Sequence, residues 1–384
     1  MKICILGRQG KLGIAELEQR YGSLNVKPIH DRYALVDAEV SIDTIGGSVK
    51  VAMVLDTLDT TNPQKVFDLV RRKMKTYVAD IPDGKIQLGV SLYDLDMPVA
   101  KVNANVLSLK KVVKQSGRSV RAVPNTDTSL SSAQTYHNHL TGQTGLELVF
   151  VKHGSKTLVG QVYGVQNIDA YAARDQARPK TDAFVGMLPP KLAQMMLNMS
   201  GVQSGRVLDP FCGTGVVLQE AALLGFDVYG TDLSEKMIDY SKINLAWLKE
   251  TYGLNINVSI DHGDAIETSW QPPIDAVVAE TYLGQPFSAP PAPDKLLQVK
   301  RICNEIISRF LLNIHDQIGE ATNICLAVPA WRSENGYETH LPLINELQKL
   351  GYERVELKHV RSSDLLYYRE DQVVARELLL LKKV

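Results

Sequence analysis

The sequence predicts an α/β protein with two unlike halves, an α+β half followed by a half built on a mostly parallel sheet. In residues 1–168, short apolar strands alternate irregularly with modest amphipathic helices. After residue 190, strand and helix patterns alternate regularly, which indicates βαβ units. The intervening residues 169–190 are rich in alanine and charge, contain three prolines and have no sustained period, as is typical of a linker.

The strands of the first half can be placed by residue number. We predict them at residues 33–38, 51–58 and 86–95, where apolar and β-branched residues gather. Residues 146–165 form one longer apolar run interrupted by Gly154 and Ser155, which predicts a hairpin that turns there.

The second half begins with a strand at 206–210 and a helix from about Thr214, then a strand at 226–233 and a helix from Ser234. Strands follow at 256–265 and 274–280, then a helix over 296–314 and a strand at 323–331. Two further strand-like segments complete the chain, which predicts a sheet with ligands at the carboxyl ends of its parallel strands.

Composition excludes several classes of protein. The chain has 384 residues, of which 45% are hydrophobic and 22% charged, enough for a buried core in two or three domains. Four dispersed cysteines without a C-x-x-C pair favour neither disulfides nor a thiolate metal site. The only close histidine pair, His137 and His139, has no acidic or thiol partner nearby, so no metal is expected. No stretch resembles a signal-peptide core or a membrane span, so we expect a cytoplasmic protein.

Charge is divided unevenly along the chain. Lys and Arg outnumber Asp and Glu by 25 to 18 in residues 1–200, whereas the acids lead by 25 to 17 in residues 201–384. A basic half indicates a module that faces a polyanion, although two unrelated domains can differ this much. Helical spacing gathers basic residues of 105–123 into one stripe, which is either a solvated face or a phosphate contact. The candidate RNA-binding residues are Lys110, Lys111, Lys114, Arg118 and Arg121.

The stretch "VLDPFCGTGVVLQEAALLGFDVYGTDL", residues 207–233, predicts a cofactor cradle. A strand delivers Asp209, and glycines in the following turn let the backbone approach a ligand before a helix begins. The next strand ends in Asp232, where open α/β sheets present an acid to ribose hydroxyls. A nicotinamide fingerprint would need glycine at Leu218, so a dinucleotide is disfavoured. Asp264 ends the third strand, where an adenine amine would lie; ordinary strand-end turns are the alternative.

These motifs resemble those of S-adenosylmethionine-dependent methyltransferases that modify exocyclic amines of nucleic acid, in particular THUMP-containing tRNA guanosine-N2 methyltransferases. The resemblance rests on "DPFCGTG", "EAALLG" and "GDA", and on residues 6–22, 117–142 and 185–201. It implies a Rossmann-like class I methyltransferase domain with a mostly parallel seven-stranded sheet, preceded by a ferredoxin-like and THUMP half. The implied domains are residues 1–62 (ferredoxin-like), 63–168 (THUMP), 169–190 (linker) and 191–384 (methyltransferase).

The resemblance also implies the roles of individual residues. S-adenosylmethionine would be the cofactor, and residues from Pro189 to Lys191 would close over it. Asp232 would bind its ribose, and Asp264 with Ala265 its adenine. The implied cofactor-binding set is Asp209, Cys212, Gly213, Thr214, Gly215, Asp232, Leu233, Asp264 and Ala265.

The fourth strand departs from the family pattern. The family places an acid or amide, two prolines and an aromatic there, whereas this chain has "ETYLG" at residues 280–284. Glu280 can still accept hydrogen bonds from an amine, and Tyr282 can stack on a base or donate its hydroxyl. These two are the predicted catalytic residues. The alternative is a solvated strand end at Glu280 with Tyr282 packed as a lid on the core.

The expected function is methyl transfer from S-adenosylmethionine to the exocyclic amine of a guanosine in tRNA. Two alternatives remain open from the sequence. One is a catalytically impaired protein of the same fold that binds RNA and S-adenosylmethionine. The other is a methyltransferase that acts on ribosomal RNA or another substrate.

Overall fold

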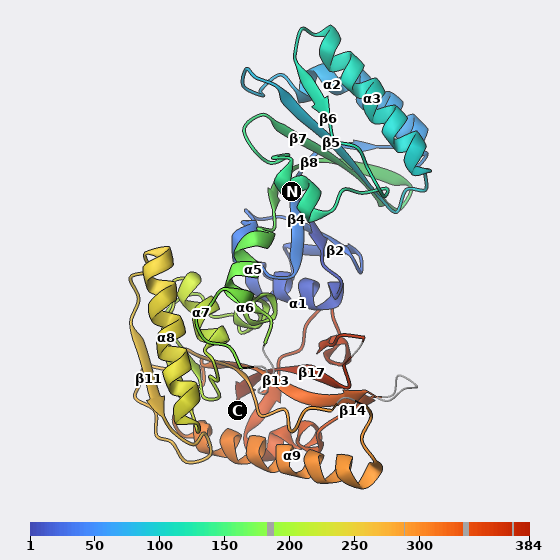
Figure 1. The fold of residues 1–384 in the computed structure, drawn as a ribbon. Helices are drawn as coiled ribbons and strands as arrows, with labels where there is room; N and C mark the ends of the chain where they lie inside the picture. Colours follow the sequence, from blue (N-terminus) through green and yellow to red (C-terminus); the bar gives the residue numbers. More distant parts are fainter. Residues whose placement is uncertain (183–187, 288, 333–337, 371) are drawn as a thin grey trace. The chain divides into compact units, whose positions relative to one another are not determined.

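The computed structural model describes residues 1–182, 188–287, 289–332, 338–370 and 372–384 (Figure 1). The chain divides into two compact units. The first comprises Met1–Gly10, Leu24–Asp43 and Ser48–Asp169, and the second comprises Lys11–Ser23, Thr44–Gly47 and Ala170–Val384. Two short N-terminal segments therefore belong to the unit that is otherwise formed by the second half of the chain.

The first unit is built on one eight-stranded sheet with the order β2-β3-β1-β4-β8-β7-β5-β6. Its strands are β1 (Lys2–Leu6), β2 (Val26–His30), β3 (Tyr33–Val36), β4 (Ser48–Leu58), β5 (Ile86–Tyr93), β6 (Val120–Ala122), β7 (Gly145–His153) and β8 (Lys156–Val165). The predicted strands are confirmed, as is the hairpin between β7 and β8. Because β4 pairs with β8, the sheet runs through both predicted segments, 1–62 and 63–168, and the division between them stays a prediction.

Helices cover this sheet. They are α2 (Pro63–Tyr77), α3 (Val99–Gln115) and α4 (Ser132–His137), with a 3₁₀ turn at Ile42–Thr44. Leu109 and Val113 of α3 are buried against the sheet, as the helical spacing predicts. The helix ends at Gln115, so the expectation that Arg118 continues its basic stripe is wrong; Gly117, with φ of +85°, terminates the helical path before it.

A buried ion pair lies inside the first unit. The ammonium nitrogen of Lys50 lies 2.5 Å from a carboxylate oxygen of Glu147 and donates to the carbonyl of Leu130 at 2.8 Å. Ser91 and Thr135 donate their hydroxyls to the same carboxylate. Both charged side chains are almost fully buried. The pair is therefore compensated inside the core by several hydrogen bonds.

The second unit is built on a nine-stranded sheet whose main path is β11-β10-β9-β12-β13-β17-β15, with β14 beside β13 and β16 beside β17. The strands are β9 (Arg206–Asp209), β10 (Asp227–Asp232), β11 (Val258–His262), β12 (Ala276–Glu280), β13 (Asn323–Arg332), β14 (Glu338–Thr339), β15 (Tyr352–Arg354), β16 (Leu366–Tyr367) and β17 (Val374–Lys383). Strands β9 to β13 are parallel, and β17 is antiparallel to its neighbours β13 and β15. The predicted α/β class with a mostly parallel seven-stranded path is confirmed.

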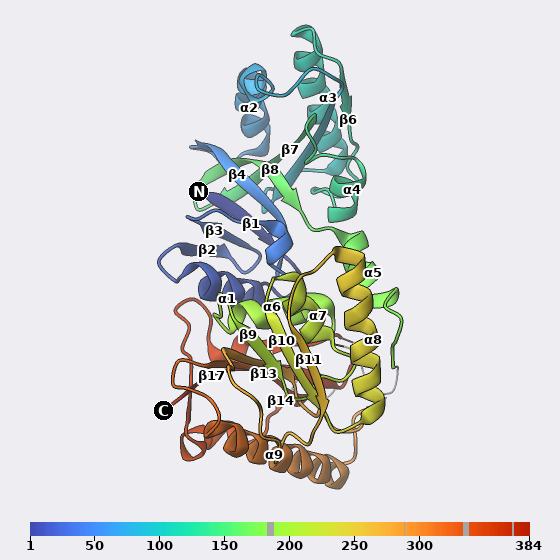
Figure 2. The ribbon, with the colours of Figure 1, turned by 90° about the vertical axis from the view of Figure 1, so that its left-hand side faces the viewer.

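The helices of this unit pack on both faces of the sheet. They are α1 (Gly10–Tyr21), α5 (Ile168–Gln176), α6 (Pro190–Met199), α7 (Val216–Leu223), α8 (Glu235–Tyr252) and α9 (Pro293–His315), with 3₁₀ turns at Pro342–Asn345, Leu347–Leu350 and Ser362–Asp364. Figures 1 and 2 show α9 on one side of the sheet and α6 and α7 on the other. Ile307 and Phe310 of α9 join Leu326 of β13 in the main core cluster.

Helix α1 is attached to the second unit through two carboxylates. Glu16 is fully buried and accepts hydrogen bonds from the backbone of Gly46 and Gly47, at 2.8 and 2.7 Å, and from the amide of Asn198 on α6 at 2.6 Å. Glu18 accepts from the backbone N–H of His359 at 2.9 Å. These contacts place α1 in the unit whose main segment begins at Ala170. No helix among the described residues is long and apolar enough to cross a membrane.

Candidate active site

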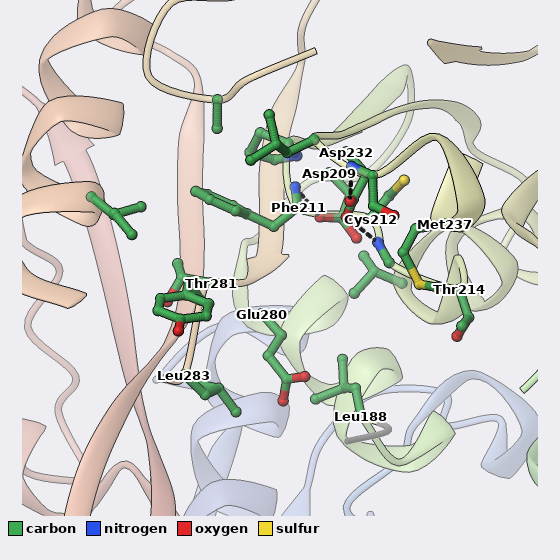
Figure 3. A pocket seen from close by; sticks show the side chains of 18 of the residues that line it. Leu188, Asp209, Phe211, Cys212, Thr214, Asp232, Met237, Glu280, Thr281 and Leu283 are labelled. Carbon is green, nitrogen blue, oxygen red and sulfur yellow. Dashed lines mark hydrogen bonds between the residues drawn. The ribbon is translucent and has the colours of Figure 1, made fainter. Parts of the chain in front are cut away.

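Four parallel strands of the second unit end around one cavity. Strands β9, β10, β11 and β12 are neighbours, and their carboxyl ends meet at one edge of the sheet. Residues from all four strand ends line a cavity of about 700 Å³. Figure 3 shows Asp209, Cys212 and Asp232 grouped on one side, with Glu280 projecting from the neighbouring strand. This is where open α/β sheets bind their ligands.

The glycine turn between β9 and α7 has the conformation that the sequence predicts. Gly213 and Gly215 have φ values of +51° and +82°, which only glycine adopts without strain. A Cβ at Gly215 would also lie 2.8 Å from the hydroxyl of Ser241 on α8. Gly215 is the N-cap of α7 and lies behind the cavity wall, whereas Gly213 lines the cavity. The turn thus brings its backbone to the ligand space.

Asp232 fixes the turn from the end of β10. One carboxylate oxygen accepts from the N–H of Gly213 at 2.9 Å and the other from the N–H of Ser234 at 2.9 Å. The N–H of Gly213 is therefore occupied by a carboxylate of the protein itself. This N–H is therefore not available to an anionic ligand.

Asp209 is the most deeply buried acid of the cavity, with 2% of its surface exposed. Its carboxylate accepts from the N–H of Phe211 at 3.1 Å. Burial raises the pKa of Asp209 well above its ordinary value, and the charges of Asp232 and Glu280 raise that pKa further. A cation bound beside Asp209 would relieve this repulsion, so the site favours a positively charged ligand group.

The end of β11 forms the next part of the wall. Asp264 follows the strand, and its carboxylate accepts from the N–H of Ile266 at 3.1 Å. Leu233, Ala265 and Ile266 line the cavity there, and Leu233 is 65% exposed despite its apolar side chain. An exposed apolar residue beside an acid suits a flat, partly polar group such as a nucleobase.

Described residues that precede α6 form one side of the cavity. Asn244 of α8 joins this part of the chain to the glycine turn, because its side-chain amide bonds both backbone groups of Lys180 and the carbonyl of Thr214, each at 2.9 Å. Asp182 and Leu188 line the cavity, and residues 183–187 lie outside the described part of the chain. Pro189 is the N-cap of α6. Leu188 lines the cavity, whereas the residues from Pro189 to Lys191 are absent from its wall.

Glu280 is the last residue of β12, and its side chain is only 16% exposed. Its carboxylate forms an ion pair with the guanidinium of Arg376 on β17. Burial raises the pKa of Glu280, while the charge of Arg376 and its hydrogen bond lower it. Tyr282 is 45% exposed and lines the cavity. The alternative of a solvated strand end under a packed tyrosine is therefore wrong.

Comparison with known proteins agrees with this geometry. Residues 178–298 match the family model of the RMKL-like methyltransferase domain. The solved structure of TrmN from Thermus thermophilus superposes on the whole chain and on 99% of its own, with a TM-score of 0.55 at 16% identity. A structure described as a possible methylase from Clostridium difficile 630 has a TM-score of 0.50 at 13% identity and covers 100% and 98% of the two chains.

The second unit has the class I methyltransferase fold.

Two sequence relatives match part of this chain. The tRNA (guanine(10)-N2)-dimethyltransferase of Methanothermobacter thermautotrophicus is 36% identical over 158 residues, which are 40% of this chain and 43% of the relative. The enzyme of the same description from Pyrococcus abyssi is 38% identical over 102 residues, 27% of this chain and 26% of its own. The chain thus spans less than half the length of the curated relatives it matches.

The second unit brings together nearly all of the residues predicted for cofactor binding and catalysis. Of the cofactor set only Gly215 is absent from the cavity wall, and Glu280 and Tyr282 both line it. Sequence reasoning missed Arg376 and Asn244. The signal for Arg376 was a charged pair inside the otherwise apolar run "VVARELLLL", residues 373–381, because a buried arginine requires a partner.

The predicted RNA-binding residues all lie in the first unit. Lys110, Lys111 and Lys114 are on α3, and Lys111 and Lys114 are exposed. Arg118 donates to the backbone carbonyls of Pro82 at 2.6 Å and Val78 at 3.5 Å. Arg121 is exposed on the edge strand β6. The described residues, His137 and His139 included, contain no group of three or more His, Cys, Asp or Glu suited to a metal ion.

Proposed function

We propose that this chain transfers the methyl group of S-adenosylmethionine to the exocyclic amine of a guanosine in tRNA. The observation that carries the proposal is the convergence of four strand ends on one acid-rich cavity, with a partly buried carboxylate, Glu280, at the fourth. The local relatives named tRNA (guanine(10)-N2)-dimethyltransferase support the choice of guanosine and tRNA.

The residues of the cavity fit this cofactor. S-adenosylmethionine carries a sulfonium and an ammonium group, and it supplies an electrophilic methyl group when bound. Among the described lining residues the carboxylates outnumber the single lysine, Lys236, which is itself paired with Asp182 at 2.7 Å. The acids are Asp182, Asp209, Asp232, Asp264 and Glu280. A cationic ligand would lower the mutual repulsion that raises the pKa of Asp209.

Each part of the wall has its own task in this proposal. Asp209 and the glycine turn hold the methionine end, and Asp232 accepts from the ribose hydroxyls. Asp264 accepts from the adenine amine, while Leu233 and Ile266 provide apolar surface for the ring. The turn and strand ends are rigid elements, so the cofactor would be held in one orientation.

The side chains at the fourth strand end act on the acceptor. Glu280 accepts an N–H of the guanine amine, which orients the nitrogen and takes up the proton that it loses. Tyr282 is exposed at the cavity and offers an aromatic face to the base. A base in a folded RNA would have to leave its stack to reach this space.

The first unit supplies the surface that the proposal needs for RNA. Exposed lysines of α3 and Arg121 of β6 would contact phosphates, as in recognition by shape and backbone. We retain the assignment of a THUMP module to residues 63–168 and of a cytoplasmic location to the protein. Arg118 is the weakest member of the set, because its guanidinium already binds two carbonyls.

The test is methyl transfer to defined RNA. The protein is incubated with labelled S-adenosylmethionine and bulk tRNA, and the RNA is digested to nucleosides and analysed by mass spectrometry. We expect N2-methylated guanosine with the wild type and a loss of about a hundredfold with Glu280→Gln. Ribosomal RNA in a parallel reaction distinguishes the alternative substrate. Binding of S-adenosylmethionine without transfer to any RNA would refute the proposed activity.

A further inference from the structure

The ion pair between Glu280 and Arg376 has no part in the roles that the proposed function gives to the cavity residues. Arg376 is on β17, its side chain is 9% exposed, and it is absent from the cavity lining. We propose that Arg376 is a positioning residue of the methyl-transfer site, whose guanidinium holds the Glu280 carboxylate and aims it at the acceptor amine. This inference rests on the proposed function and deepens it.

Strand register explains why this pair needs a glutamate. Glu280 on β12 lies opposite Ala327 on β13, and Arg376 lies on β17 at the far side of that strand. Since neighbouring strands are about 4.8 Å apart, strands β12 and β17 are about 9.6 Å apart. Arg376 is paired with Pro329, two residues beyond Ala327, so the two side chains must reach both across β13 and along it. The small side chain of Ala327 leaves room for them. An aspartate at 280 would be shorter by about 1.5 Å, which would lengthen the contact with the guanidinium beyond hydrogen-bonding distance.

The backbone at the strand end is already fixed without Arg376. Thr281 donates both its N–H, at 3.0 Å, and its hydroxyl, at 3.2 Å, to the carbonyl of Ala327. The remaining freedom of Glu280 therefore lies in its side-chain torsions. The contact with Arg376 restrains these torsions, because one carboxylate oxygen accepts from the guanidinium Nε while the other is left for the substrate.

Charge gives Arg376 its second effect. The charged groups that face Glu280 are Arg376 from β17 and Asp209 from β9. A buried carboxylate becomes neutral more easily, and a neutral acid cannot accept a proton from the amine. Loss of the guanidinium removes the cation that, in the described part of the chain, opposes this tendency. The fraction of Glu280 that is ionised at neutral pH would then fall.

The test compares substitutions of the pair with a control on the same strand. Arg376→Gln should lower kcat by about a hundredfold, and Glu280→Asp should lower it similarly although an acid is kept. Arg376→Lys should restore part of the activity. Lys382→Gln, also on β17, removes a half-exposed pair with Glu353 at 3.3 Å and should leave kcat unchanged.

Dependence on pH separates positioning from simple stability. In Arg376→Gln the acid limb of kcat should move to higher pH, so that activity recovers as pH rises, while affinity for S-adenosylmethionine stays near that of the wild type. A lower melting temperature of Arg376→Gln together with weaker cofactor binding and an unchanged pH profile of kcat would overturn the proposal. Wild-type kcat in Arg376→Gln would overturn it as well.

A measurement without substrate keeps this inference apart from the proposed function. NMR titration of ¹³C-labelled glutamate carboxylates gives the pKa of Glu280 in the wild type and in Arg376→Gln, and we expect a higher pKa in the variant. An unchanged pKa refutes the role of Arg376 whatever the enzyme does. Absence of methyl transfer by the wild type, with the expected pKa difference, would instead refute the proposed function.

Discussion

Cofactor affinity should depend on pH through Asp209. This carboxyl is buried, and the neighbouring acids raise its pKa further, so it takes up a proton at a higher pH than an exposed aspartate does. Binding of a cation beside it favours the ionised form and therefore releases a proton. Below the pKa of Asp209 in the empty protein, affinity for S-adenosylmethionine should fall by up to tenfold per pH unit, and above that pKa it should level off.

Asp209→Asn tests the size of this effect. The substitution keeps the shape of the side chain and removes its charge, and a hydrogen bond to a charged group contributes about 1.5–3 kcal/mol. We expect Kd to rise by about ten- to a hundredfold and to lose most of its pH dependence. Isothermal titration in two buffers of different ionisation enthalpy measures both affinity and proton release.

A matched control is available at the opposite end of a neighbouring strand. Asp227→Asn removes a carboxylate from the start of β10, where it is partly exposed and bonded to Asn257. It should bind S-adenosylmethionine as the wild type does. If Asp209→Asn shows the same affinity and the same proton release as the control, Asp209 does not contact a cationic part of the cofactor.

Three further predictions concern stability and RNA. Gly215→Ala should destabilise the protein by about 1–3 kcal/mol, because φ of +82° and the nearby Ser241 hydroxyl both oppose a Cβ. Gly225→Ala, at φ of +88° with open space around it, should destabilise the protein less. Melting temperatures of the two variants measure the difference. Lys50→Met should cost about 3–5 kcal/mol in urea unfolding by leaving Glu147 buried without its cation, and Glu147→Leu in the same chain should recover most of it. Replacement of the three α3 lysines by glutamine should reduce the salt dependence of tRNA binding. The slope of log affinity against log salt concentration should fall by about one unit for each phosphate that a lysine no longer neutralises. Filter binding across a salt series measures this slope, and an unchanged slope would exclude that surface.

The local patterns of the second half predicted its elements and its cavity well. Regular alternation and strand-end acids are local signals, so Asp209, Asp232 and Asp264 could be placed at one sheet edge from the sequence alone. The pairing of Glu280 with Arg376 could not be predicted, because it joins residues 96 positions apart across an intervening strand.

The membership of α1 in the second unit was also beyond sequence reasoning. Its pattern predicts an amphipathic helix but does not indicate which sheet it covers. The partners of Glu16 and Glu18, among them Asn198 and His359, show that α1 packs against residues far along the chain. Helix α3 gave the opposite error, because the helical spacing was extended through Gly117 to a residue outside the helix.

The early position of α1 has a consequence for how the protein is made. During translation this helix leaves the ribosome well before the second unit is complete, because the partner of Glu18, His359, is synthesised 341 positions later. Such distant contacts slow folding, since a long loop must close before they form. Until then α1 exposes the apolar face that it later buries, which is a reason for nascent chains of this protein to engage chaperones.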